Sequence, residues 1–598
     1  MTSESGGPSS LTRFLFVHQI DEYPDRGRRI GLLALAVLAT IILYYTYYTQ
    51  TGVTPNILAT YHMSFSFYVW IVIVSNAIGA FASLPASLTD RLGRSNMVIY
   101  GLLLVGLLVA VGVPVAHTKW SFAVVICLLG LVEGAILVAT PALVRDFSPQ
   151  VGRASAMGFW TLGPVVGSLV VSVVAAHTLN HFVTEANPTG WRSQFYFSGI
   201  TALVLFVVCL LFLKDLSARL RDQLLRSEEE AALLEVRARG ISEEDLRKAT
   251  DRPWSQMLRW DLVGSAVGIS LFLLVYYAAA GFFTVYWSTV FKNADGSSLS
   301  VTQANGLNEW FWGAEIVALI TVGFVSDRLR VRKPFMAAGA IGAIIFLILF
   351  LLRASHPTSA YSTLVVVSVG LAVCLSTCYA PWMAAYTETV EAKNPALVAT
   401  GLALWGWILR VIAAGSFIFL PLVINTVSPI IDNQPVATPE ILAFVTNHAD
   451  SVAFAQSHAE LLEVIRQHEA VVSAASQDPS PANIAATMKA IGKTNFEELV
   501  ANEAQLATLV APYTKQLDYL AAHADQFTAL QDALKKTPSQ WQRWYWICAG
   551  GMVLFLPTIF LTKGRWSPAK ARQDFEDHER VLQEELSRLS PSPSVAAG

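Results

Sequence analysis

Charged side chains inside long apolar stretches are the residues of this sequence best suited to do chemistry. Glu133, Glu315 and Arg410 each lie near the middle of such a stretch, whereas Glu309 lies nearer an end and is expected to be solvated. A charge at the centre of a bilayer costs about 2.5–3.5 kcal/mol on insertion scales, so each of these residues is expected to have a structural or functional role. A buried carboxyl can take up and release a proton near neutral pH. We therefore predict Glu133 and Glu315 as proton-coupling candidates; the alternative for Glu133 is a protonated or hydrogen-bonded core residue.

Arg410 and a set of aromatic residues are candidates for binding a substrate. Arg410 could pair with Glu315, either as a structural ion pair or as a gated pair in which the guanidinium binds an anionic substrate or senses protonation of Glu315. Tyr276, Tyr277 and Trp382 add aromatic surface within the apolar stretches. If they line a cavity, the substrate is organic and partly apolar. The alternative is that these aromatic residues form helix contacts or an interfacial belt.

These residues must be positioned by helices that cross a membrane. The chain has 598 residues, of which 54% are hydrophobic and only 14% are charged, against about 25% charged in soluble domains. A membrane-crossing helix needs about 20 apolar residues. Twelve runs qualify: 29–49, 66–87, 96–116, 120–144, 155–178, 193–213, 262–290, 306–325, 334–353, 361–387, 397–424 and 541–562. The sequence predicts an all-α membrane protein with twelve transmembrane helices in two six-helix halves.

The distribution of Lys and Arg between the connections predicts the topology. The connections that follow even-numbered runs carry most of these cations, and such connections remain on the cytoplasmic side. We therefore predict a multi-pass plasma-membrane protein with both termini in the cytoplasm. The predicted regions are a cytoplasmic N-terminal tail (1–28), the N-terminal six-helix half (29–213), a cytoplasmic central loop (214–261), helices seven to eleven (262–424), an extracytoplasmic helical insertion (425–540), helix twelve (541–562) and a cytoplasmic C-terminal tail (563–598).

The predicted insertion is polar and is rich in Ala, Leu, Glu and Gln. Its apolar residues recur at three- and four-residue spacing, which is typical of helices, and Pro479 and Pro481 interrupt it. We expect two or more antiparallel helices packed against each other. The insertion is either a solvated cap or a docking module for a protein partner.

A repeated Asp-Arg pair links the two halves. Asp90 and Arg91 follow the second apolar run, and Asp327 and Arg328 follow the eighth, which is the second of the other half. With Gly93 and Arg94, the first copy resembles the loop 2–3 motif of the major facilitator superfamily, whose members have paired six-helix halves. The resemblance covers all twelve helices but not the insertion. It implies conformational gating, with Asp90 contacting helix eleven and Asp327 contacting helix five; the alternative is that these charges only set the topology. The gating candidates are Asp90, Arg91, Gly93, Arg94, Asp327 and Arg328.

The fifth run carries a second motif of the same family. Gly158, Gly163, Pro164 and Gly167 resemble the helix-five motif of proton antiporters, which favours export. The glycine spacing allows close backbone approach, and Pro164 bends the helix. The Arg that such antiporters usually carry in helix four is replaced here by Gly130.

Several function classes have no support in the sequence. There is no phosphate-binding loop, nucleophile motif or metal-ligand cluster, so we expect no enzyme activity, no metal and no cofactor. A net charge of −3 does not indicate nucleic-acid binding. The leading hypothesis is a proton-coupled exporter of small organic solutes, whose partners are the solute, protons and the lipid bilayer. The alternatives are a proton symporter that imports an organic solute such as an organic anion, and a transporter-like receptor or assembly factor that acts through the insertion.

Overall fold

The computed structural model describes most of the chain as helices. It describes residues 14–82, 93–148, 160–217, 219–221, 223, 257–391, 398–573, 576–577 and 580. Twelve helices among these residues are long and apolar enough to cross a membrane, which confirms the predicted number of spans. The chain forms two compact units. The membrane unit comprises the described residues of Met1–Lys292, Ser298–Ser428 and Thr537–Gly598, and the insertion unit comprises Asn293–Ser297 and Pro429–Lys536.

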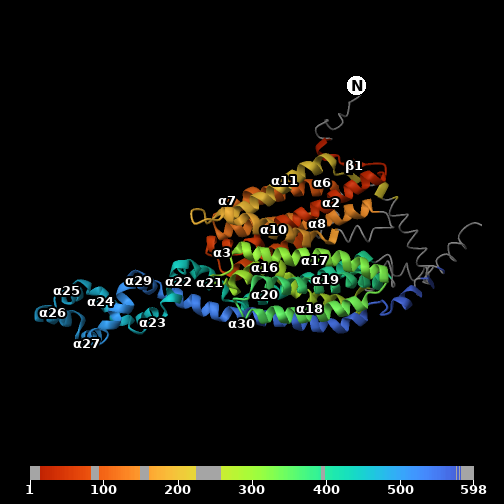
Figure 1. Cartoon of the computed structure of the whole chain (residues 1–598). Helices are drawn as coiled ribbons and strands as arrows, with labels where there is room; N and C mark the ends of the chain where they lie inside the picture. The colour runs from red at the N-terminus through yellow and green to blue at the C-terminus, as the bar shows by residue number, and fades with distance from the viewer. Residues whose placement is uncertain are drawn as a thin grey trace, which may run out of the picture. The chain divides into compact units, whose positions relative to one another are not determined.

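Six spans form the N-terminal half of the membrane unit (Figure 1). Side-chain caps begin two of them: Asp25 accepts hydrogen bonds from the Gly27 and Arg28 N–H groups, and Thr118 forms a capping box with Ser121. Such caps satisfy N–H groups that the helix itself leaves free. The helices are α2 (Arg26–Gly52), α4 (Phe65–Ala82), α6 (Arg94–Leu107, continued by η1, Leu108–Gly112, and α7, Val113–Val115), α8 (Lys119–Phe147), α10 (Gly163–Phe182) and α11 (Ser193–Phe212), with short α3 (Thr54–Tyr61) after α2 and η2 (Gly190–Arg192) before α11.

The other six spans form the C-terminal half. Two consecutive helices make up its first span, and a capping box of Ser300 and Gln303 begins the second. The helices are α15 (Trp260–Phe272) and α16 (Leu274–Val290), α17 (Val301–Leu329), α18 (Lys333–Arg353), α19 (Tyr361–Glu391), α20 (Val398–Val423) and α30 (Ala524–Phe555) with η7 (Leu556–Leu561). The helix α30 begins at Ala524, well before the predicted apolar run 541–562.

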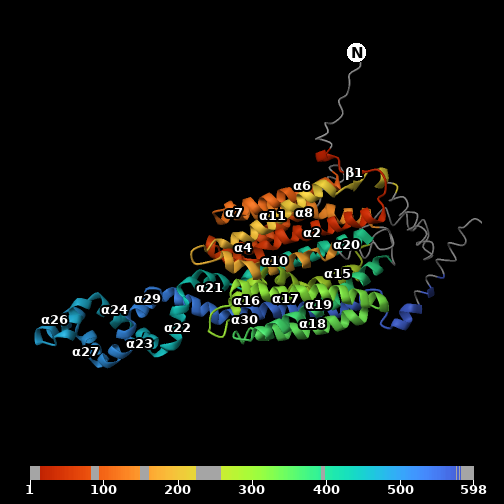
Figure 2. The ribbon, with the colours of Figure 1, turned by 45° about the horizontal axis from the view of Figure 1, so that its top comes forward.

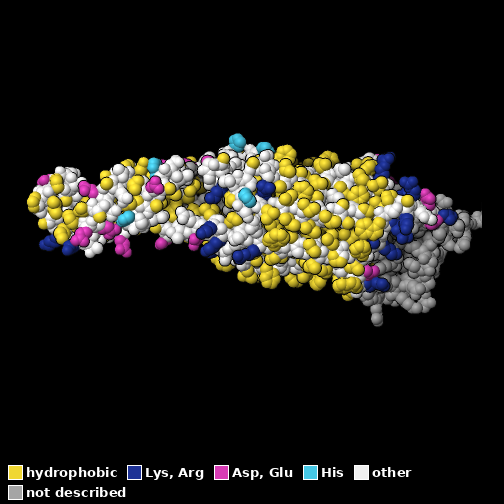
Figure 3. Space-filling model, turned by 60° about the horizontal axis from the view of Figure 1, so that its bottom comes forward, with side chains coloured by type: hydrophobic (Ala, Val, Ile, Leu, Met, Phe, Trp, Pro, Cys, Tyr) yellow, Lys and Arg dark blue, Asp and Glu magenta, His cyan; other side chains and the backbone are white. Residues whose placement is uncertain are grey.

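The two halves lie side by side within the membrane unit, and α10 packs against α17 (Figures 1 and 2). We call the end that holds the start of α6 the Arg94 end, and the end where α2 finishes the Gly52 end. In Figure 1 the helices of the two halves diverge toward the Arg94 end. Hydrophobic side chains form a belt over the surface, and Lys and Arg gather beyond both edges of it (Figure 3). This surface is the one expected of a protein in a bilayer.

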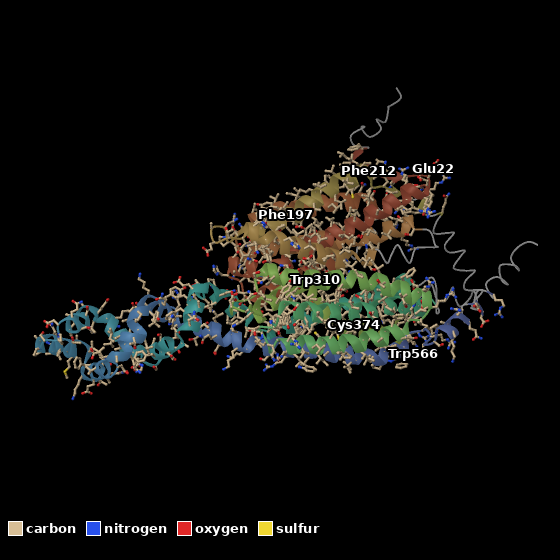
Figure 4. The ribbon with its side chains drawn as sticks, viewed as in Figure 1. Glu22, Phe197, Phe212, Trp310, Cys374 and Trp566 are labelled. Atoms are coloured by element: carbon tan, nitrogen blue, oxygen red, sulfur yellow. The ribbon has the colours of Figure 1, made fainter. Side chains whose placement is uncertain are left out.

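A short segment before the first span is attached to the Arg94 end of the N-terminal half. Strand β1 (Gln19–Ile20) pairs in parallel with β2 (Asp215–Leu216), which directly follows α11. The ring nitrogens of buried His18 lie 2.8 Å from Asn96 Oδ1 and 3.2 Å from the Leu210 carbonyl oxygen. Glu22 and Phe212 are therefore found at the same end of this half (Figure 4).

The insertion unit consists mainly of short helices in two antiparallel arms that pack against each other, as predicted. Phe444, Phe454, Val510 and Leu517 form a buried core between the arms. The chain turns back near Pro479 and Pro481, where α25 meets α26. The helices are α21 (Val427–Asn433), η4 (Gln434–Val436), α22 (Pro439–Asn447), α23 (Ala449–Ser457), α24 (Ala459–Gln467), α25 (Glu469–Gln477), α26 (Pro481–Ile491), α27 (Lys493–Ala501), α28 (Glu503–Gln505), η5 (Leu506–Val510), η6 (Ala511–Tyr513), α29 (Thr514–Ala522) and the start of α30.

A ten-residue repeat underlies the first arm. His448, His458 and His468 each separate two nine-residue helices and adopt nearly the same backbone conformation, with φ of −126°, −119° and −119°. In the returning arm, Asn502 and His523 also stand alone between helices. Sequence reasoning did not detect this repeat, although the ten-residue spacing of the three histidines is visible in the sequence.

Candidate functional site

Glu133 lies on α8 at the centre of the N-terminal half, with only 6% of its surface exposed. Two glycines bring α8 very close to α4: a Cβ on Gly134 would collide with the Gly79 carbonyl, and one on Gly130 would collide with Ser75. Close backbone approach through small residues is typical of packing between membrane helices. An Arg side chain does not fit at position 130, because α4 occupies the space beside Gly130.

Groups from both halves act electrostatically on one another at this centre. Arg410 on α20 acts on Glu133 and on Tyr44 of α2. Glu133 also acts on Tyr47 and Tyr48, which lie one turn further along α2. A carboxylate of one half, a guanidinium of the other and a set of tyrosine hydroxyls therefore share one polar region inside an apolar bundle.

Glu315 on α17 is buried in the C-terminal half and forms no ion pair with Arg410 among the described residues. The candidate partner was Arg410, but the groups on which Glu315 acts are Tyr276 and Tyr379. Glu315 is 3% exposed, and its Oε2 has no hydrogen-bond partner among the described residues. Arg410 has an electrostatic effect on Glu133 of the other half.

The predicted aromatic candidates divide into two groups. Tyr276 and Tyr277 are partly exposed; the Tyr276 ring contacts Trp312, and Tyr277 acts on Tyr48 of the other half. Trp382, in contrast, is fully buried and donates a hydrogen bond to Ser265 Oγ at 3.0 Å. Trp382 therefore connects α19 to α15, and its part in substrate binding stays a prediction.

At the Gly52 end, polar contacts join the two halves. Asn305 of α17 donates to the Gly52 carbonyl at 2.7 Å, Thr302 donates to Asn180 of α10 at 3.1 Å, and the Phe65 N–H donates to Ser428 at 2.7 Å. A cavity of about 10 Å³, lined by Gly52, Asn305 and other residues of both halves, lies in the same region. This volume is about that of one water molecule, so the end is tightly packed.

His177 and Glu309 form a further contact between the halves that sequence reasoning missed. His177 Nε2 on α10 lies 3.2 Å from Glu309 Oε2 on α17. Glu309 was expected to be solvated, but its side chain is only 34% exposed. The one available signal was a histidine inside an apolar run, and a sequence alone does not show what it faces.

Comparison with known proteins identifies the family. The family model of the Major Facilitator Superfamily matches residues 36–418, which is more than half of the chain. The chain belongs to the major facilitator superfamily. The curated proteins compared with the sequence give no match.

Solved structures of this superfamily share the fold. A bacterial homologue of the human lysosomal transporter Spinster, inward-facing and occupied, matches with a TM-score of 0.54 and 14% identity over 91% of this chain and 100% of that one. Its inward-facing, unoccupied form matches with a TM-score of 0.51, 14% identity and the same coverage. A D-xylose-proton symporter matches with a TM-score of 0.51 and 14% identity over 66% of this chain and 90% of that one. At these identities the likeness shows the fold alone.

The first superfamily loop motif lies partly within the described residues. Asp90 and Arg91 fall outside them. Gly93 has a φ of +89°, a conformation that glycine adopts without strain. The Arg94 N–H donates to Asp215 Oδ2 at 2.8 Å, and its guanidinium donates to Asp146 at 2.6 Å. Arg94 therefore connects α6, α8 and β2 within the N-terminal half.

The second motif copy forms an ion-pair network within the C-terminal half. Asp327 and Glu388 both bind the guanidinium of Arg332, at 2.6 Å and 2.9 Å, and Arg328 is exposed. Burial opposes the charge of Arg332, but the two carboxylates together raise its pKa above the usual value. The predicted contact of Asp327 with helix five stays a prediction, because the start of that predicted helix, 155–159, lies outside the described residues.

The helix-five motif of the superfamily packs against α2, although Gly158 lies outside the described residues. A Cβ on Gly163 would come within 2.7 Å of Thr40, and one on Gly167 within 2.6 Å of Tyr44. Pro164 lies in the first turn of α10, directly after a break in the helix. These glycines thus place the α2 tyrosines beside α10.

Proposed function

We propose that this superfamily member is a secondary transporter that exports small organic solutes in exchange for protons by alternating access. The observation that carries the proposal is the burial of the Glu133 carboxyl on α8, where Gly130 and Gly134 hold this helix against α4. Arg410, from the other half, attracts this carboxylate electrostatically without contacting it at ion-pair distance. Protonation of Glu133 removes its attraction for Arg410, and this links proton binding to the relative position of the halves. The surrounding tyrosines supply apolar surface and hydroxyl groups for an organic solute.

The direction of transport follows from the helix-five motif. Gly163 and Gly167, which bring α10 onto α2 beside Tyr44, resemble the motif of proton antiporters. A second candidate function is proton-coupled import of an organic anion, because the Arg410 side chain is exposed and has no anionic partner at ion-pair distance among the described residues. The solved structure described as a D-xylose-proton symporter shows that this fold also serves symport in another protein.

We also propose the orientation and location of the protein. In addition to Arg94, the Arg94 end carries Arg145, Arg330 and Lys333. The connections at the Gly52 end carry fewer cations. Under the positive-inside rule the Arg94 end and both termini face the cytoplasm. The insertion then lies on the opposite side of the plasma membrane.

The test is paired metabolite profiling of cells and medium. Cells that overexpress the wild-type protein are compared with cells that express Glu133→Gln and with cells that carry an empty vector. Glu185→Gln, at an exposed residue of the connection between α10 and α11, is the matched control for loss of a carboxylate. We expect a compound enriched outside wild-type and Glu185→Gln cells, with at least tenfold less export by Glu133→Gln.

The other outcomes separate the hypotheses. A compound depleted from the medium by the wild-type protein reverses the direction and supports the symporter. Loss of that uptake in Arg410→Gln would assign the anion-binding role to Arg410. Wild-type export that Glu133→Gln leaves unchanged would exclude Glu133 as the coupling residue.

A further inference from the structure

One ion pair joins the two halves near the Gly52 end. His177 belongs to α10 of the N-terminal half and Glu309 to α17 of the C-terminal half, and their Nε2 and Oε2 atoms lie 3.2 Å apart. Asn180, one turn from His177, accepts a hydrogen bond from Thr302 of α17 at 3.1 Å. These contacts lie on the same faces of the two helices, so separation of the halves at this end must break both.

The charged surroundings of this pair are sparse. Of the helices packed against α10 and α17, the described residues of α11 and α16 contain no Asp, Glu, Lys, Arg or His. Helix α2 contains Arg26, Arg28 and Arg29, all in its first turn at the Arg94 end. Helix α19 has acidic residues only near its other end, and it presents Tyr361, which Glu309 influences electrostatically.

Two further charged groups near α10 are directed elsewhere or lie further along the helix. Arg192 of η2, which also contacts α10, donates to the Ala116 carbonyl at 3.2 Å. His181 lies one turn beyond His177 on α10 and is exposed. Among the described residues, Glu309 is the acidic group at ion-pair distance from His177.

We propose that His177 and Glu309 form a proton-sensitive latch, which holds the halves together at the Gly52 end while both side chains are charged and weakens when either is neutral. The proposal rests on the alternating access of the proposed function, and it adds the group that senses pH on this side of the bundle. Glu133 would respond to protons at the centre of the bundle, and the latch would set how readily this end opens.

The direction of the pH effect follows from how imidazole and carboxyl groups bind protons. An imidazole ordinarily gains its proton below about pH 6.5, and a carboxyl loses its proton above about pH 4.3. The contact is an ion pair only while the imidazole carries a proton and the carboxyl does not. It weakens toward pH 8 as the imidazole becomes neutral. An exposed ion pair shifts a two-state equilibrium by no more than about fivefold.

Spin-label distance measurements on the full chain in lipid nanodiscs test the latch without a substrate. The five native cysteines are replaced by alanine. Labels are placed at Ala186→Cys, between α10 and α11, and at Thr358→Cys, between α18 and α19; both positions are exposed, and they lie on different halves at the Gly52 end. We expect the population with the longer distance to grow about two- to fivefold between pH 5.5 and pH 8.

Variants assign the effect to the pair. His177→Gln and Glu309→Gln should remove the pH dependence, and His177→Lys, which stays charged, should keep the short distance at pH 8. The matched control His181→Gln should behave as the wild type does. Size-exclusion profiles of each variant show whether it is folded, so loss of folding is not mistaken for loss of the latch.

Two results would overturn the proposal. One is a wild-type distance distribution that does not change with pH, and the other is a pH dependence that persists in folded His177→Gln. Because the measurement uses no solute and no gradient, either result leaves the proposed function standing. Conversely, failure of the export assay with a normal pH response would count against the proposed function and not against the latch.

Discussion

At the scale of single residues, Asp215 is the group outside the spans with the clearest consequence for stability. Its carboxyl is fully buried where β2 meets the start of α6, and Oδ2 accepts the Arg94 N–H at 2.8 Å. Burial raises its pKa above the usual value, even though Arg94 and Arg221 oppose this. The ionised form therefore costs stability in the folded protein, and protonation recovers that stability as the pH falls.

We predict that Asp215→Asn unfolds at a higher temperature than the wild-type protein at pH 7.5. The amide oxygen keeps the acceptor for the Arg94 N–H but carries no buried charge. The difference should shrink toward pH 4.5, because the wild-type carboxyl then binds a proton. Thermal unfolding of both proteins across this pH range measures it. A difference that grows as the pH falls would show that the ionised carboxylate stabilises the fold.

The residues of the site were predictable in kind but not in pairing. Glu133, Glu315 and Arg410 were identified because charges in apolar runs are costly. The sequence did not show that Arg410 acts on Glu133 rather than on Glu315, because helix rotation and tilt depend on packing against neighbours. The His177–Glu309 contact was missed for the same reason, since its partners lie on helices from different halves.

At the scale of elements, the contact between α4 and α8 fixes the position of Glu133. A Cβ on Gly134 would collide with the backbone of Gly79, and backbone cannot rotate away as a side chain can. We predict that Gly134→Ala destabilises the membrane unit by about 1–3 kcal/mol, the usual cost of overpacking. Transport should fall as well, because α8 must shift together with Glu133.

Gly406→Ala is the matched control for this substitution. Gly406 also lies in a spanning helix, α20, and nothing lies within 4 Å of a Cβ built on it. Alanine is favoured over glycine in a helix by about 1 kcal/mol, so this variant should be as stable as the wild type or slightly more stable. Thermal unfolding in the same lipid compares the two variants. Equal unfolding temperatures would mean that α4 and α8 separate without cost.

Helical elements differ in how well the sequence specifies them. The twelve spans were predictable because about 20 apolar residues have few alternatives to a membrane helix. The insertion helices were predicted only in type, because their boundaries depend on single residues such as His448 and His458 that break the helix without Gly or Pro. The early start of α30 was missed because its first turns are polar.

At the scale of the whole molecule, the chain segments that lead into and out of the insertion contact each other within the membrane unit. The Asn425 N–H donates to Gln540 Oε1 at 3.0 Å, Gln540 donates back to Asn425 Oδ1 at 2.7 Å, and Thr537 donates to Thr426 at 2.5 Å. The chain segments on either side of the insertion thus contact each other without the help of residues 429–536. A short flexible connection is enough to span such a junction.

We predict that replacing residues 429–536 with a short Gly-Ser linker leaves the membrane unit folded and transport unchanged. The insertion has its own buried core, so Phe454→Ala, which removes a core side chain at a cost of about 3–5 kcal/mol, should unfold the insertion and also spare transport. Proteolysis and flux measurements on both variants test this independence. If the linker variant is folded but transports nothing, the insertion takes part in the transport cycle. If it transports normally but the cells lose another phenotype, the insertion serves a partner, and the receptor or assembly hypothesis gains its first support.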